Sequence, residues 1–310
     1  MEVRLANPRG FCAGVDRAIE IVERALELHG APVYVLHEIV HNRHVVDDLA
    51  ARGTRFVDDL ELVPEGAVTI FSAHGVSDEV VATAARRRLR VIDATCPLVT
   101  KVHVQAQQYA ARGDEVILIG HPGHPEVEGT RGRIEGRVVV LSTVAEVEAL
   151  EVADPQKLSY VTQTTLSIDD TREVIDALVR RFPRIRGPEL KDICYATQNR
   201  QNAVRRLTAG EGIDCLIVIG SKNSSNSNRL AELGLRSGVR SHLIDNASEI
   251  RPEWLVGAGR IGVTAGASAP EALVQQVVER LKELGVVSVR EIEGEVETTV
   301  FRLPESLGAR

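Results

Sequence analysis

The sequence predicts an α/β protein of three similar domains, each with a mainly parallel sheet, arranged with pseudo-threefold symmetry. Short apolar segments alternate with amphipathic ones along the 310 residues, which is typical of right-handed units of strand, helix and parallel strand. The same order of segments occurs three times, and each copy opens with a cysteine directly before a segment of helical period. We therefore expect domains over residues 1–95, 96–192 and 193–285, and a tail over 286–310 that packs back on the first domain through VVSVREI.

Each copy begins with an amphipathic helix. In the first copy apolar residues recur at helical spacing from Val15 to Leu26, and Gly30 ends the segment. The second helix is expected after Cys96 and the third after Cys194.

Strands and polar loops follow each helix in a fixed order. The first strands read VYVL, VILIG and CLIVIG, and they lead into the loops HEIVHN, HPGHPE and SKNSSN. A shorter strand-and-turn unit comes next, and then a strand that leads into a second polar loop, SAHG, QTTLS or AGAS. A closing helix is expected to begin near Ser77, Ser167 or Ser268, each of which can act as an N-cap. In the first two copies a strand, at RVID and at KDIC, leads to the next cysteine.

The spacing of these landmarks predicts where the ligand-binding ends of the sheets meet. The first polar loop lies 29, 28 and 30 residues after the cysteine in the three copies, and the second lies 62, 68 and 74 residues after it. Ligands of parallel α/β units bind beyond the carboxyl ends of the strands. Three such domains around a pseudo-threefold axis would bring together Cys12, Cys96 and Cys194.

Three convergent thiolates suit a 4Fe-4S cluster, and one iron would then have no protein ligand. Such an iron is a Lewis acid that can bind a substrate hydroxyl. Each cysteine precedes a helix, whose dipole favours the thiolate. The sequence thus predicts a central iron–sulfur site. Cys215 lies inside the strand CLIVIG without a counterpart in the other copies, so we expect it in the core.

Zinc is the competing metal at the three cysteines. His41, His74 or His124 could complete a Cys₃His set. The three cysteines are, however, 84 and 98 residues apart, whereas structural zinc ligands usually come in close-spaced pairs.

The polar loops carry compact hydrogen-bond donors suited to phosphate oxygens. Helix N-termini beside them add backbone N–H groups and a favourable dipole. A single histidine or serine is more often a cap or turn residue, but repetition in phase with the cysteines favours a binding site. The candidates are His41, His74, His124, Ser224, Asn226 and Ser268.

Glu126 follows His124 by two residues and is a candidate acid. In a poorly solvated cavity the pKa of its carboxyl would rise enough for it to deliver a proton, although a carboxylate in a first helical turn is the alternative interpretation. Thr164 and Thr165 are either hydroxyls at a strand end or substrate contacts.

Composition excludes several classes of function. The net charge is −7, no long basic run occurs, and aromatic residues are 3% of the chain, so binding to nucleic acid is disfavoured. No apolar stretch approaches the roughly 18–20 residues that span a bilayer, and the N-terminal segment lacks the pattern of a signal peptide. We expect a cytoplasmic protein without a membrane partner.

Nine motifs together resemble the LytB-type 4-hydroxy-3-methylbut-2-enyl diphosphate reductase family. The resemblance runs from residue 5 to about residue 283, in order. The motifs are ANPRGFCAGVDRAI, HEIVHN, SAHGVS, DATCPLVTKVH, HPEVEGT, TQTTLS, DICYATQNRQ, GSKNSSNSNRL and TAGASAPE.

This resemblance implies an enzyme of the last step of the non-mevalonate isoprenoid pathway. Family members remove an allylic hydroxyl reductively to give isopentenyl and dimethylallyl diphosphate, with electrons from an external carrier such as ferredoxin or flavodoxin. The implied cluster ligands are Cys12, Cys96 and Cys194, and Glu126 and Thr164 match the proton donor and the threonine beside the substrate hydroxyl. The implied diphosphate ligands are His41, His74, His124, Ser224, Ser225, Asn226 and Ser268.

Two other functions use similar features. A hydro-lyase with a three-cysteine cluster would turn over without a reductant. A cluster-bearing sensor or structural protein would show no affinity for diphosphate.

Overall fold

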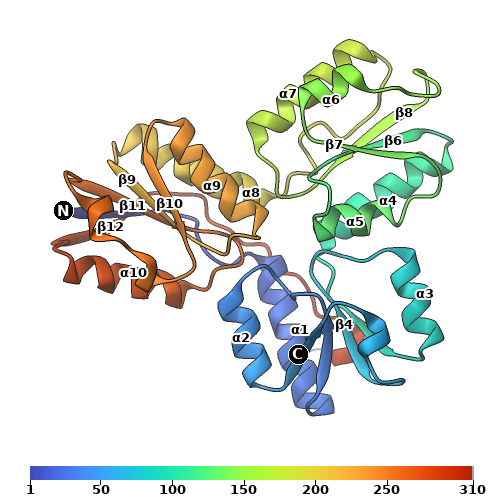
Figure 1. The fold of residues 1–310 in the computed structure, drawn as a ribbon, viewed down its shortest axis with the longest axis horizontal. Helices are drawn as coiled ribbons and strands as arrows, with labels where there is room; N and C mark the ends of the chain where they lie inside the picture. Colours follow the sequence, from blue (N-terminus) through green and yellow to red (C-terminus); the bar gives the residue numbers. More distant parts are fainter. Residues whose placement is uncertain (309–310) are drawn as a thin grey trace. The chain divides into compact units, whose positions relative to one another are not determined.

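The computed structural model describes residues 1–308, which fall into two compact units. Unit 1 comprises Met1–Asp16, Val40–Asp48 and Tyr195–Val300, and unit 2 comprises Arg17–Ile39, Leu49–Cys194 and the described residues from 301 onward. Unit 1 holds one parallel sheet and unit 2 holds two (Figure 1), which confirms the predicted α/β fold with parallel sheets. The pseudo-threefold arrangement and the boundaries at residues 95, 192 and 285 stay predictions.

Unit 1 is built on a five-stranded sheet with helices on both faces. Alternate residues of its second strand, β9 (Cys215–Ile219), point to opposite sides, so Ile217 packs with Leu273 and Val277, whereas Leu216 packs with Val204 and Leu230. The strand order is β10 (Arg240–Ile244), β9 (Cys215–Ile219), β11 (Arg260–Ala265), β1 (Glu2–Leu5) and β12 (Ser288–Glu291). The helical segments are α8 (Tyr195–Arg205), the π-helix η2 (Arg206–Gly210), α9 (Ser225–Arg236), η3 (Ala247–Glu249), η4 (Pro252–Leu255) and α10 (Glu271–Glu283).

The first strand of the chain belongs to the sheet of the third copy. Leu5 of β1 is in register with Val263 of β11 on one side and with Glu291 of β12 on the other. The tail segment VVSVREI therefore does pair with the first strand, but both lie in the sheet that carries β9 and β11.

Unit 2 contains a four-stranded and a three-stranded sheet. Their orders are β3 (Thr54–Val57), β2 (Val33–Leu36), β4 (Val68–Phe71), β5 (Arg90–Asp93), and β7 (Val138–Leu141), β6 (Glu115–Ile119), β8 (Leu158–Thr162). The helical segments are η1 (Leu60–Leu62), α3 (Asp78–Arg86), α4 (Pro97–Ala111), α5 (Pro125–Arg131), α6 (Val144–Ala149), α7 (Ile168–Arg181) and η5 (Glu305–Leu307). Two further helices cross the unit boundaries, α1 (Ala13–His29) and α2 (Arg43–Ala51).

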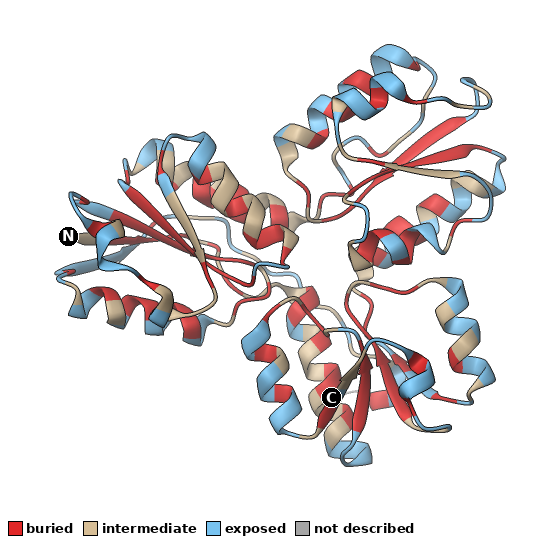
Figure 2. Cartoon of the chain, viewed as in Figure 1, coloured by how far each residue is buried: buried red, intermediate tan, exposed pale blue. Residues whose placement is uncertain are grey.

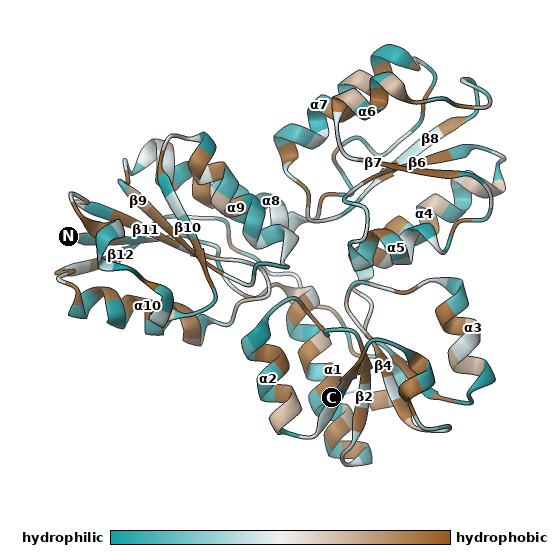
Figure 3. Cartoon of the chain, viewed as in Figure 1, coloured by the Kyte–Doolittle hydropathy of each residue, from teal (hydrophilic) through white to brown (hydrophobic). Residues whose placement is uncertain are grey.

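The three-stranded sheet is covered on both faces, like the sheet of unit 1. Ile117 packs with Leu178 of α7 on one face, and Leu118 packs with Val102 of α4 and Val127 of α5 on the other. The strands β2, β4, β6, β8 and β9 are buried along their whole length (Figure 2) and are hydrophobic (Figure 3), whereas β12 is exposed. Within residues 1–308, no helix combines the length and apolar character needed to cross a membrane.

Most predicted helix N-caps and strands are confirmed, but the N-cap at Ser268 and the strand at KDIC are wrong. Ser77 and Ser167 are N-caps, since their hydroxyls accept hydrogen bonds from the amides of Val80 (3.3 Å) and Asp170 (3.2 Å). Ser268 is not an N-cap, because Pro270 occupies that position before α10, and the Ser268 hydroxyl instead donates to the carbonyl of His41 at 2.8 Å.

The predicted strand at KDIC is also wrong, whereas the strand at RVID is confirmed as β5. Residues 191–193 form a turn and a bend, and Arg186 pairs instead with the edge of β8 through an isolated bridge to Ser159. Four residues, two charged and then two apolar, do not reveal which nearby segment pairs with the free edge of a sheet.

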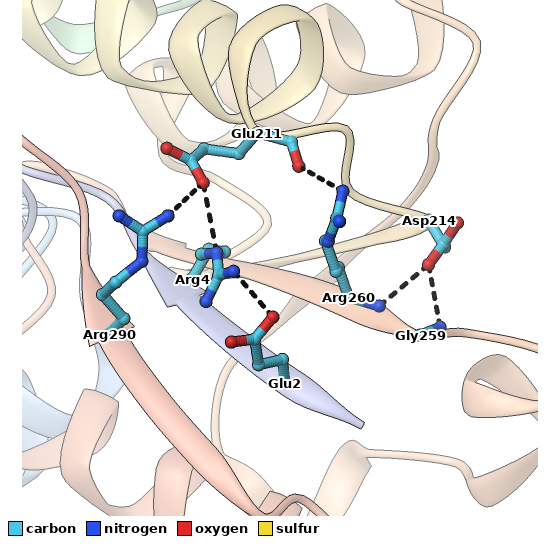
Figure 4. Close-up of polar contacts among 7 residues, drawn as sticks. All are labelled: Glu2, Arg4, Glu211, Asp214, Gly259, Arg260 and Arg290. Carbon is cyan, nitrogen blue, oxygen red and sulfur yellow. Dashed lines mark hydrogen bonds and ion pairs between the residues drawn. The ribbon is translucent and has the colours of Figure 1, made fainter.

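Charged residues tie together several segments of the unit 1 sheet (Figure 4). Arg4 is buried in β1 and pairs with Glu2 (2.6 Å) and Glu211 (3.1 Å), and Glu211 also pairs with Arg290 of β12 (2.5 Å). The Asp214 carboxylate accepts hydrogen bonds from two backbone amides at the start of β11. These contacts anchor β1 and β12 to the chain that leads into β9.

Candidate active site

In unit 1, the candidate residues follow the carboxyl ends of three neighbouring strands. Cys12 follows β1, Ser224 follows β9, and Ser268 follows β11. These strands are adjacent and parallel, so the three loops lie at one edge of the sheet.

The polar residues of unit 1 contact one another at this edge. Ser268 Oγ donates to the carbonyl of His41, and Asn223 Nδ2 lies 3.4 Å from His41 Nδ1. Ser224 is the N-cap of α9 and its hydroxyl accepts a hydrogen bond from the amide of Ser227. Ser225 is the first residue of α9 and is partly exposed.

Asn226 has the clearest sign of an absent ligand. Its side chain is 4% exposed, yet neither its amide nitrogen nor its amide oxygen has a hydrogen-bond partner among the described residues. Burial of an unsatisfied amide is costly unless a ligand or water completes it. An anionic ligand at the N-terminus of α9 would accept from this amide nitrogen and would be favoured by the helix dipole.

In unit 2, His74 and His124 lie close together. Their ring centroids are 6.0 Å apart in an edge-to-face arrangement. His124 Nδ1 accepts a hydrogen bond from the amide of Glu126 (3.1 Å), so in the neutral ring the proton is on Nε2. His124 can therefore donate to a phosphate oxygen.

Glu126 is 3% exposed and is held by Thr164. The Thr164 amide donates to Oε1 at 2.6 Å, and the Thr164 hydroxyl donates to Oε2 at 3.0 Å. Burial raises the pKa of Glu126 to about 7, although both hydrogen bonds lower it. A carboxyl with this pKa is partly protonated near neutral pH and can act as a general acid.

The cysteines of unit 2 adjoin the same loops. The Cys194 amide donates to the carbonyl of Thr164 (3.1 Å), and the Cys96 amide donates to the carbonyl of Ala73 (3.0 Å). Cys96 is the N-cap residue of α4, as Cys12 and Cys194 directly precede α1 and α8.

The three predicted cluster ligands are divided between the units. Cys12 belongs to unit 1, and Cys96 and Cys194 belong to unit 2. Within residues 1–308, no group of three or more His, Cys, Asp or Glu side chains is arranged to hold a metal ion. The convergence of the three cysteines therefore stays a prediction.

The thiol of Cys12 is in a mixed electrostatic environment. Burial raises the pKa of Cys12, whereas the Arg200 guanidinium and the amides of Gly14 and Val15 lower it. Cys215 differs because it is fully buried in β9, as predicted, and burial raises its pKa to about 11. At Cys12, burial outweighs these opposing interactions, so the thiol is favoured over the thiolate.

Sequence reasoning missed two buried residues beside the site. The negative charge of Asp192 helps to raise the pKa of Glu126, and its own carboxylate accepts from the Thr162 amide. His103 packs directly behind the His74 loop, where a Cβ on Gly75 would lie 2.6 Å from the ring. The sequence did carry a signal for His103. It lies seven residues after Cys96, about two helical turns, and therefore on the same face of α4, and a buried polar side chain usually has a hydrogen-bonding or functional role.

Comparison with known proteins decides the family. The model of the LytB protein family matches residues 3–282. The chain belongs to the LytB family. It is 60% identical over 309 residues to the 4-hydroxy-3-methylbut-2-enyl diphosphate reductase of Bordetella pertussis, covering 100% of this chain and 94% of that protein. The enzyme of the same name from Chromohalobacter salexigens is 58% identical over 314 residues, covering 100% of this chain and 98% of that protein.

A solved structure supports the same assignment. The E-1-hydroxy-2-methyl-but-2-enyl-4-diphosphate reductase of Plasmodium falciparum matches with a TM-score of 0.94 and 38% identity, over 98% of this chain and 96% of that one. The predicted family and the predicted class of enzyme, a reductase, are confirmed.

Proposed function

We propose that this LytB family member carries out the two-electron reductive dehydroxylation of 4-hydroxy-3-methylbut-2-enyl diphosphate to isopentenyl and dimethylallyl diphosphate. One observation carries the proposal beyond family membership. In unit 2, hydrogen bonds run continuously from the amide of Cys194 to Thr164, from Thr164 to Glu126, and from the Glu126 amide to His124. These hydrogen bonds connect a proposed cluster ligand, a buried acid and a histidine that is proposed to bind phosphate.

The proposed diphosphate ligands of each unit are hydrogen-bond donors. The His124 Nε2 proton, the Asn226 amide and the Ser224 hydroxyl are each at a helix N-terminus, where anions are favoured. His41, His74, Ser225 and Ser268 are the other proposed diphosphate ligands. The net charge of −7 does not oppose this proposal, because an anion can be bound by local hydrogen-bond donors.

The proposed cofactor fits the donor set. A 4Fe-4S cluster held by the thiolates of Cys12, Cys96 and Cys194 would supply electrons and one iron open to the substrate hydroxyl. An external carrier such as ferredoxin or flavodoxin is proposed to deliver the electrons.

Glu126 and Thr164 are proposed to handle the proton at the departing oxygen. The reaction consumes two electrons and two protons: the C–O bond breaks, oxygen leaves as water and a C–H bond forms. Protonated Glu126 gives the proton that lets the hydroxyl leave, and the Thr164 hydroxyl orients that oxygen. The second proton adds at either end of the allylic carbons, which accounts for two products.

An anaerobic assay tests the proposal. Reconstituted protein is mixed with the substrate and a low-potential reductant, and reductant oxidation and products are followed together. We expect reductant-dependent formation of both five-carbon diphosphates, and loss of cluster and activity in Cys12→Ser, Cys96→Ser and Cys194→Ser. The matched control Cys215→Ser should keep both. Turnover without a reductant would favour a hydro-lyase, and absence of diphosphate affinity would favour a cluster-bearing sensor.

A further inference from the structure

Arg17 follows Cys12 in the sequence but forms hydrogen bonds to the loop that precedes Cys96. It lies on α1, five residues after Cys12. Its Nη1 donates to the carbonyls of Ala94 (3.3 Å) and Thr95 (3.1 Å), the two residues directly before Cys96.

Lys101 repeats this arrangement one copy later. It lies on α4, five residues after Cys96. Its Nζ donates to the carbonyl of Lys191 (3.0 Å) and is 3.6 Å from an oxygen of Asp192, in the loop that precedes Cys194.

Arg200 makes the third contact of this kind, with the loop that precedes Cys12. It lies on α8, six residues after Cys194, and is fully buried. Its Nε and Nη2 donate to the carbonyl of Gly10 (3.0 and 2.7 Å), and Nη2 also donates to that of Phe11 (3.0 Å). Gly10 and Phe11 are the two residues before Cys12.

The C-terminal segment completes two of these contacts. The Glu297 carboxylate accepts from Arg200 Nη1 (3.0 Å) and from the Asn199 amide (3.0 Å). The carbonyl of Arg302 accepts from Arg17 Nε (2.8 Å). The guanidinium of Arg200 is thereby paired with a carboxylate in a buried position, where an unpaired charge would be costly.

We infer that Arg17, Lys101 and Arg200 are positioning residues for the cluster ligands, each holding the loop of the next cysteine in cyclic order and bringing one positive charge to it. The inference rests on the proposed function, which makes the three cysteines ligands. Carbonyls that accept from a fixed cation cannot rotate freely, so the backbone before each cysteine is held in one conformation. The charges of Arg17 and Arg200 act on the sulfurs of Cys96 and Cys12, respectively.

Amide hydrogen exchange in the metal-free protein tests the holding of each loop. We expect Arg17→Gln to speed exchange of the Cys96 amide about tenfold and to leave the Cys194 amide unchanged, and Lys101→Gln to do the reverse. Lys101→Arg should restore the wild-type rate at Cys194. Arg181→Gln is the matched control, because Arg181 donates to the carbonyls of Val147, Glu148 and Leu150, away from any cysteine.

The pattern across loops decides the outcome. Equal acceleration at both cysteine amides in both variants, or none in either, would overturn the inference. Arg200→Lys adds a third arm, since lysine keeps the charge but lacks the planar group whose three nitrogens donate to Gly10, Phe11, Ala196 and Glu297. Faster exchange of the Cys12 amide is expected there.

The reduction potential of the reconstituted protein gives a readout of charge. Loss of a nearby cation disfavours the more negative reduced state, so Arg17→Gln and Lys101→Gln should shift the potential to more negative values. Arg181→Gln and Lys101→Arg should not. An unchanged potential in both glutamine variants would contradict the inference that these residues bring a positive charge to the cluster ligands. Failure of wild-type protein to assemble a cluster would count against the proposed function, and the exchange pattern would still decide the holding of the loops.

Discussion

Glu126 combines deep burial with two hydrogen bonds that favour its charged form, and burial prevails. Because its pKa is raised to about 7, the protonated acid is present below neutral pH and is lost as pH rises through about 7. A step that needs this proton should slow over the same range. We expect Glu126→Gln to retain the fold and substrate binding but to lose about 100-fold or more in rate, the scale of a general acid. Rates measured with a fixed reductant across this pH range check both points, and normal turnover in the variant would refute the role.

Thr164 tunes the same carboxyl and can be tested separately. Thr164→Val removes the hydroxyl that donates to Glu126 Oε2 but keeps the shape of the side chain and the backbone amide that donates to Oε1. The charged form loses one hydrogen bond, so the pKa of Glu126 should rise further, by about one unit or less. Infrared titration of the carboxyl in substrate-free protein measures this shift. Thr164→Ser is the control and should leave the pKa where it is; a lowered pKa in the valine variant would contradict the interpretation.

At the scale of elements, the first turn of α9 packs through Ser227 against the residues that directly follow β9 and β11. A Cβ at Gly220, after β9, would lie 2.1 Å from Ser227 Oγ, and one at Gly266, after β11, would lie 2.0 Å from it. Ser227 Oγ in turn donates to Ser224 Oγ at 3.0 Å. The first turn of α9, with its candidate diphosphate ligands, is thus positioned by two glycines that allow close approach.

Gly266→Ala should therefore displace the start of α9. Overpacking of about 1–3 kcal/mol at this contact would weaken the binding of inorganic diphosphate roughly tenfold or more, while cluster assembly continues. Calorimetric titration with diphosphate measures the effect. Gly210→Ala is the control, because a Cβ there meets nothing within 4 Å. Equal affinity in both variants would mean that α9 does not hold the anion.

The elements that sequence could predict were those whose signals are local. The Ser77 and Ser167 caps, the cysteine-led helices and the apolar strands all follow from residues within one turn or one strand. Ser268 failed because a proline two residues later took the cap position, and KDIC failed because the pairing of a sheet edge depends on a distant segment. For the same reason nothing in residues 2–5 indicated that β1 pairs with β11 and β12.

At the scale of the whole molecule, repetition in the sequence predicted three parallel sheets and placed each candidate residue near a strand end. Repetition could not reveal which side chain holds the loop before each cysteine. Arg17, Lys101 and Arg200 illustrate this, since each lies on one copy's helix but donates to the loop before another copy's cysteine. Only the fold shows that the three contacts are equivalent.

The division of the cysteines between two units leads to a last prediction. A cluster bound by Cys12 of unit 1 and by Cys96 and Cys194 of unit 2 would stabilise both units together, because it binds only when both are folded. Trp254, the single tryptophan, lies in unit 1 and stacks on His242 at 3.9 Å, so its fluorescence reports unfolding of that unit. Circular dichroism reports both units. Cluster loading should make the fluorescence and circular dichroism signals change together in one transition, at a higher temperature than in the metal-free protein. A cluster held by unit 2 alone would leave the Trp254 transition where it is in the metal-free protein, and that result would exclude Cys12 as a ligand.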